Sequence, residues 1–139
     1  MTTNSTQKDI EALADSLSAS ADALHTRLMS ALRQKPPAVA QPVAQTLFEN
    51  EVALRQRANG LYLEAAVLAA SGLGGAQKQL LDVTARAQDK IRKIEHVKDL
   101  IQLTGELLSL AAAIAAGKPD RLAEPYENIK HHLEAMGAK

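Results

Sequence analysis

The stretch Leu107-Leu-Ser-Leu-Ala-Ala-Ala-Ile-Ala-Ala116 carries no charge, and it closes a longer segment, residues 76–116, that has the spacing of a single helix. Apolar residues recur every seven positions along this segment, which is a helical rather than a strand period. The sequence therefore predicts one long helix over 76–116, around which the other elements must pack. The repeat consists of Leu80, Ala87, Ile94, Ile101, Leu108 and Ala115.

A second apolar stripe begins in the C-terminal half of this predicted helix, about 100° around from the first. That half is therefore apolar over about twice the width of the N-terminal half, and we expect it to need cover on more than one side. The second stripe consists of Leu103, Leu107, Leu110 and Ile114.

Two further long helices are predicted before residue 76. The first spans about 5–34, with Ser5 or Thr6 as its N-cap, and a proline-rich linker over 35–42 cannot continue it. The second spans about 42–71, with Pro42 in its first turn. Its leucine seam predicts packing within the bundle rather than a separate coiled-coil dimer, because the seam is short and Glu51 interrupts it. The seam consists of Leu47, Leu54, Leu61 and Leu68.

Glycines and prolines mark the remaining turns. The glycine-rich segment 72–75 predicts a tight reversal, so that the second helix and the long helix become antiparallel neighbours. Gly117 and Pro119 should end the long helix, and a short fourth helix should span about 125–136. The fold class is therefore all-α: a single domain over 1–139, built as an antiparallel bundle of three long helices plus a short C-terminal fourth helix.

The predicted helix lengths do not match. Two helices of about 30 residues span about 45 Å, whereas 76–116 would span about 60 Å. The excess begins near Gly105, where we expect either a hinge or the close approach of another backbone.

The second stripe would lie on the part of the long helix that extends past the other two helices. That part has two apolar sides, and the fourth helix could cover only one of them. Leu103, Leu107, Leu110 and Ile114 are therefore predicted to form a partner interface, most simply in a homodimer, otherwise with another protein. The rival expectation is that Val39 and Val43 of the linker wrap over this end.

Composition excludes several classes of function. The chain has 16 basic and 16 acidic residues and no cysteine, which excludes thiolate zinc sites and gives no general attraction to nucleic acid or anionic lipid. The N-terminus lacks a basic segment followed by an apolar one, so we expect no secretory signal and a cytoplasmic protein. Nucleic-acid binding is not expected, because no aromatic residues are interleaved among the basic ones. The apolar run is short for a membrane span, so membrane association is possible but not expected.

Candidate chemistry is sparse. Glu127, His131 and Glu134 share one face of the predicted fourth helix and are weak candidates for a metal site. No motif that would position a nucleophile is present, so we expect no enzyme, no catalytic residue and no cofactor.

These observations favour a non-enzymatic helical-bundle interaction protein: an oligomeric adaptor, a chaperone-like binder or an inhibitory partner. Its working surface would be the apolar C-terminal half of the long helix. One alternative is a surface-active protein that coats lipid or polymer granules. A weaker alternative is a bundle that binds a metal or a small ligand.

Overall fold

The computed structural model describes residues 2–35, 39–71, 77–94, 97–117 and 119–136, and these residues form helices and turns. Within them the α-helices are α1 (Thr2–Arg33), α2 (Gln41–Ser71), α3 (Gln77–Lys93), α4 (Val97–Ala116) and α5 (Ala123–Ala135), with a 3-10 turn, η1, at Pro119–Arg121. The all-α class is confirmed, but the described part of the chain holds five helices where four are predicted.

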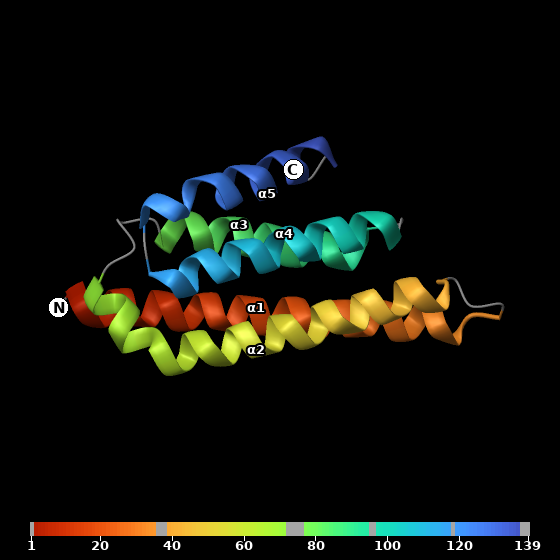
Figure 1. Cartoon of the computed structure of the whole chain (residues 1–139), viewed down its shortest axis with the longest axis horizontal. Helices are drawn as coiled ribbons and strands as arrows, with labels where there is room; N and C mark the ends of the chain where they lie inside the picture. The colour runs from red at the N-terminus through yellow and green to blue at the C-terminus, as the bar shows by residue number, and fades with distance from the viewer. Residues whose placement is uncertain (1, 36–38, 72–76, 95–96, 118, 137–139) are drawn as a thin grey trace.

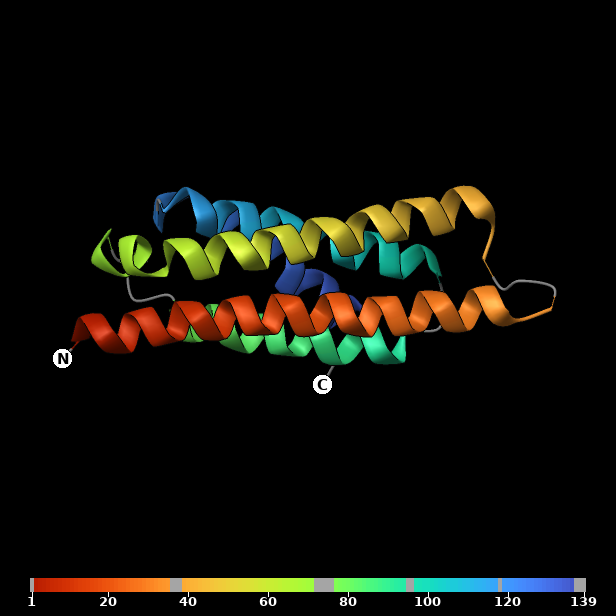
Figure 2. The same ribbon diagram turned by 90° about the horizontal axis from the view of Figure 1, so that it is seen from below.

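The helices form two stacked hairpins and a cover. Antiparallel α1 and α2 form the longer hairpin, and α3 and α4 form a shorter one that packs on it (Figure 1). In this arrangement α3 lies against α1 and α4 lies against α2, while α5 covers the opposite face of α3 and α4 (Figures 1 and 2). The second helix and the predicted long helix are therefore not antiparallel neighbours along their length: α3, the first half of that segment, packs chiefly on α1, whereas α4, the second half, packs on α2.

The prediction of one helix over 76–116 is also wrong. Helix α3 ends at Lys93 and α4 begins at Val97, so the chain folds back in this region. The guanidinium of Arg27 on α1 donates hydrogen bonds to the carbonyl oxygens of Arg92, at 2.8 Å, and of Ile94. The last carbonyls of a helix lack partners within it, so Arg27 satisfies carbonyls where α3 ends.

The break removes the mismatch in length. Helices α3 and α4 have 17 and 20 residues, about 26 and 30 Å, and they fit side by side on an α1–α2 hairpin about 46–48 Å long. Neither shorter helix extends past the α1–α2 hairpin (Figure 1).

Most other boundaries agree with the predicted ranges to within a few residues. Gly117 follows the last residue of α4 with φ of 68°, the left-handed backbone that glycine adopts readily, and its N–H donates to the Ile114 carbonyl at 3.0 Å. This confirms Gly117 as the stop signal. The reversal predicted over 72–75 lies outside the described residues.

The core runs the length of both hairpins and is almost entirely aliphatic. The leucine seam of α2 is buried within the chain, which confirms its interpretation as bundle packing. In α1 the apolar residues Ile10, Leu13, Leu17, Leu24 and Leu28 are buried, whereas Leu32 is 40% exposed near the end of the α1–α2 hairpin. Val39 in the linker is also buried.

Candidate functional site

The four residues predicted as a partner interface are covered by the chain itself. Leu103, Leu107, Leu110 and Ile114 are each 0% exposed, and the helix that carries them packs against α2 and α5. The expectation that they stay uncovered is wrong, because the fold-back brings α4 alongside α2 instead of letting it project. Their burial removes the reason for placing an interface there.

Gly105 is neither at the hinge nor in a tight contact. Helix α4 continues through it, and a Cβ built at this position would have no atom within 4 Å outside its own helix backbone. The chain reverses about ten residues earlier, after Lys93. Both expected roles of Gly105 are therefore wrong for this structure.

The weak metal candidates lie on the surface of α5. Glu127 and His131 line an open groove of about 660 Å³ between α4 and α5, and Glu134 is exposed outside that lining. In the same groove the imidazole of His132 on α5 contacts the carboxylate of Glu106 on α4. In the described part of the chain, no three His, Asp or Glu side chains lie close enough together to hold a metal ion.

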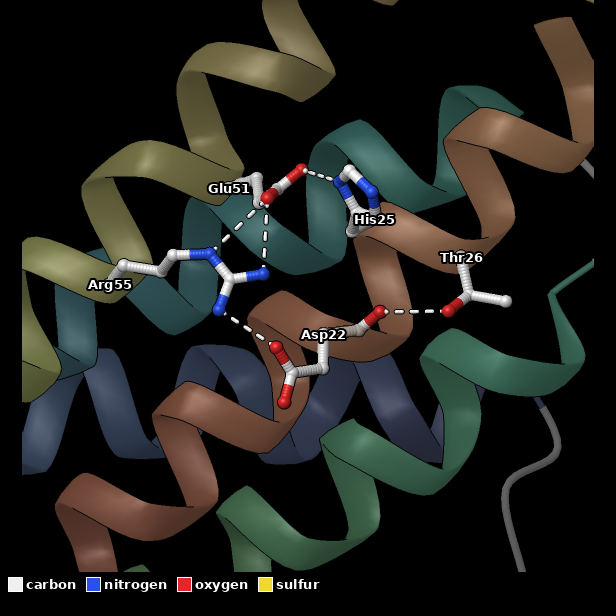
Figure 3. A network of polar contacts seen from close by, with 5 residues as sticks. All are labelled: Asp22, His25, Thr26, Glu51 and Arg55. Atoms are coloured by element: carbon white, nitrogen blue, oxygen red, sulfur yellow. Dashed lines mark hydrogen bonds and ion pairs between the residues drawn. The ribbon is translucent and has the colours of Figure 1, made fainter.

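A polar network joins α1 to α2 around one buried carboxylate (Figure 3). Glu51 on α2 is only 5% exposed, and its Oε2 accepts hydrogen bonds from Nε and an Nη of Arg55 at 3.2 and 3.1 Å. Its Oε1 lies 3.0 Å from Nδ1 of His25 on α1. The other Nη of Arg55 donates to Asp22 on α1 at 2.7 Å. Hydrogen bonds to Asp22 and then to Glu51 raise the pKa of Arg55, against a lowering by burial.

Two other polar contacts fix how the helices pack. Asn50 on α2 donates to the hydroxyl of buried Thr104 on α4 at 2.8 Å. The hydroxyl of Tyr62 on α2 donates to the carboxylate of Asp15 on α1, and this bond raises the pKa of Tyr62 to about 12. These contacts are structural, since each polar group is used to join one helix to another.

The exposed apolar residues point to another part of the molecule. Six large hydrophobic side chains are exposed among the described residues, and five of them belong to α2. Leu63 is 85% exposed, Val67 64% and Phe48 48%, with Val52 and Tyr62 close to 40%. The outer face of α2 therefore carries large apolar side chains, beside exposed charged residues such as Glu49, Arg57 and Glu64.

We define the outer stripe of α2 as seven exposed positions that recur every three or four residues and so share one side of the helix. None of the seven carries a charge, and Val67 extends the stripe at one edge. The positions are Phe48, Val52, Gln56, Asn59, Leu63, Ala66 and Ala70.

Sequence reasoning missed this stripe because it followed the leucine seam on the other side of α2. The signal was present in the spacing of Phe48, Val52, Leu63 and Val67, which are separated by four, eleven and four residues. The polar residues Gln56 and Asn59 interrupt the stripe and weaken its periodicity. Only the structure shows which of the two apolar sides the other helices cover.

Helix α4 is the one helix, of those the structure describes, with the length and apolar composition to cross a membrane, at a mean hydropathy of 1.4. A core helix of a bundle has the same composition, and seven residues of α4 are buried against its neighbours. Packing within the bundle therefore accounts for this composition.

Comparison of the chain with protein-family profiles, with curated proteins and with solved structures gave no match. Function has to be inferred from the residues of the chain itself.

Proposed function

We propose that this chain is a non-enzymatic helical-bundle interaction protein that docks onto a protein partner through the outer stripe of α2. The observation that carries the proposal is the exposure of Leu63, Val67 and Phe48 on one side of a single helix. Burying side chains of this size contributes about 1.5–3 kcal/mol each when burial is complete. A partner helix laid along the stripe would therefore gain enough free energy to bind.

The position of the stripe also supports this function. The buried face of α2 is occupied by α1 and α4, and the polar network around Glu51 holds α1 in place beside it. The outer face is thus presented by a rigid element, which lowers the entropy lost when a partner binds. We therefore propose α2, in place of the C-terminal half of the segment 76–116, as the working surface.

A substitution on the stripe tests the proposal. Leu63→Asp places a charge where a partner would have to desolvate it, and the variant should keep its fold because Leu63 is almost fully exposed. The matched control is Ala85→Asp, which adds the same charge at an exposed position on α3. Circular dichroism should show equal helicity for both variants and the wild type.

The readout is affinity purification from the native host with wild type, Leu63→Asp and Ala85→Asp as baits. We expect a partner, either a second protein or an untagged copy of the chain, that co-elutes with the wild type and with Ala85→Asp but is lost with Leu63→Asp. Identical sets of co-eluting proteins for all three baits would contradict the proposal.

The surface-active alternative makes a different prediction for the same three proteins. It predicts that the wild type floats with lipid vesicles. The zero net charge of the chain argues against this alternative for anionic lipid, because it gives no electrostatic attraction. Flotation of the wild type that Leu63→Asp abolishes, without any protein partner, would favour a coat over a docking protein.

A further inference from the structure

We propose that the partner of the outer stripe is a second copy of this chain, with the two α2 helices antiparallel and centred on Asn59. This inference rests on the proposed function and adds the identity of the partner and the register. A two-fold dimer of this kind pairs each residue with the one equally far from Asn59 on the other side in the second copy; this brings stripe positions together at both ends, whereas Leu63 lies opposite Arg55 and Gln56 opposite Tyr62.

The side chains of the stripe are arranged by size in a way that fits this register. Phe48 and Ala70 both stand 11 residues from Asn59, and Val52 and Ala66 both stand 7 residues from it. The large side chains of one copy therefore meet the small ones of the other at both ends. A parallel pairing would instead place Phe48 against Phe48 at one end and leave Ala70 against Ala70 at the other.

Asn59 gives the stripe a self-complementary centre. Its side chain is exposed and makes no hydrogen bond within the described part of the chain. A carboxamide both donates and accepts, so two copies of Asn59 that face each other can satisfy one another. A single asparagine within an apolar helix interface is known to fix register at some expense of stability.

Electrostatics and size are consistent with a dimer of moderate affinity. The stripe carries no charge and the chain has a net charge of zero, so two copies do not repel each other. Arg55, at the edge of the stripe, is paired with Asp22 and Glu51. From Phe48 to Ala70 the stripe is about 33 Å long and one helix wide, which belongs at the small end of specific interfaces, near 1,200 Å² in total.

Single cysteines test the register directly, because the natural chain contains none. A disulfide requires Cα atoms within about 7 Å of each other. Under mild oxidation at tens of micromolar, Asn59→Cys should form a covalent dimer. Phe48→Cys alone should stay monomeric, since its two copies would lie about 33 Å apart, whereas a mixture of Phe48→Cys and Ala70→Cys should cross-link.

Each other outcome overturns the inference in a recognisable way. Efficient cross-linking of Phe48→Cys to itself would indicate parallel helices. A reduced, unlinked Asn59→Cys protein together with an unlinked mixture would mean that no such dimer forms. If a different protein still co-elutes in a manner that depends on Leu63, the proposed function stands without the homodimer; if none does, both fail.

Discussion

At the scale of single residues, the most constrained group is the Glu51 carboxylate. It is buried at the α1–α2 interface, where it contacts Arg55 and His25. A buried charge is tolerated only while it is paired, so removing a partner costs more than replacing the whole pair by apolar groups. The two partners differ in exposure: Glu51 is nearly inaccessible to water, whereas the side chain of Arg55 is 40% exposed.

The first prediction follows from this asymmetry. Arg55→Ala should lower the free energy of unfolding by about 2 kcal/mol, because Glu51 then stays buried with His25 as its one remaining partner in the network. Adding Glu51→Leu to this variant should recover most of the loss. Urea denaturation at fixed protein concentration measures both changes. A double variant that is less stable than Arg55→Ala would show that the carboxylate itself holds the helices together.

The second prediction concerns Tyr62 and alkaline pH. Its hydrogen bond to Asp15 raises the pKa of Tyr62 from 10.0 to about 12 in the folded protein. The folded state therefore favours the neutral phenol, so this contribution to stability is complete below pH 10 and is lost as the pH rises from 10 to about 12. Tyr62→Phe should show a smaller loss of stability over that range than the wild type.

Thermal unfolding across that range of pH checks this prediction. Tyr126→Phe is the matched control, since it removes the other tyrosine of the chain and leaves the contact between Tyr62 and Asp15 intact. This control should keep the pH dependence of the wild type. Equal slopes for Tyr62→Phe and the wild type would show that the hydrogen bond to Asp15 does not form in solution.

At the scale of elements, the decisive feature is the end of α3 at Lys93. The apolar repeat passes through this point without a glycine or proline, since Ile94 and Ile101 both keep the seven-residue spacing. Local signals therefore favour one helix, whereas at the break Arg27 of α1 donates hydrogen bonds to the carbonyl oxygens of Arg92 and Ile94. The periodicity of the sequence cannot predict such a contact, because its residues lie more than sixty positions apart.

The same limit explains which parts of the candidate site could be predicted. Prolines and Gly117 mark local boundaries, so the end of α1, the start of α2, the position of α5 and the end of α4 follow from the sequence. The N-cap predicted at Ser5 or Thr6 is wrong, because α1 already begins at Thr2. In α4 the spacing identifies two apolar sides, but only packing decides between them: Leu103 and Leu107 became the core, whereas Ile101 and Leu108 lie at its edge. The outer stripe of α2 could not be predicted for the same reason, because the sequence does not show which apolar side of α2 the other helices cover.

The third prediction concerns the glycines inside helices. A Cβ at Gly60 or Gly105 would meet no atom within 4 Å outside the local helix backbone, and neither residue has a positive φ. Gly60→Ala and Gly105→Ala should therefore each raise the free energy of unfolding by about 0.5–1 kcal/mol, measured by urea denaturation. Gly117→Ala is the contrasting control and should destabilise the protein, because φ there is 68°. A destabilising Gly105→Ala would mean that another backbone approaches α4 at this point.

At the scale of the whole molecule, the two hairpins stack with α1 and α2 on one side (Figure 2), and most of the exposed large hydrophobic residues in the described part of the chain belong to α2. The exposed apolar residues of α2 that we propose as a docking surface thus lie on the longer hairpin. Self-association through that face joins two bundles without opening either of them. It requires no change in the folded structure.

Sedimentation equilibrium of the wild type beside Leu63→Asp tests the central claim that the outer stripe of α2 is the docking surface. At tens of micromolar the wild type should approach twice the chain mass of 14.8 kDa, and Leu63→Asp should remain at 14.8 kDa. Ala85→Asp should behave as the wild type does. A Leu63→Asp protein that still sediments as a dimer would contradict the claim, because the contact would then lie elsewhere on the molecule.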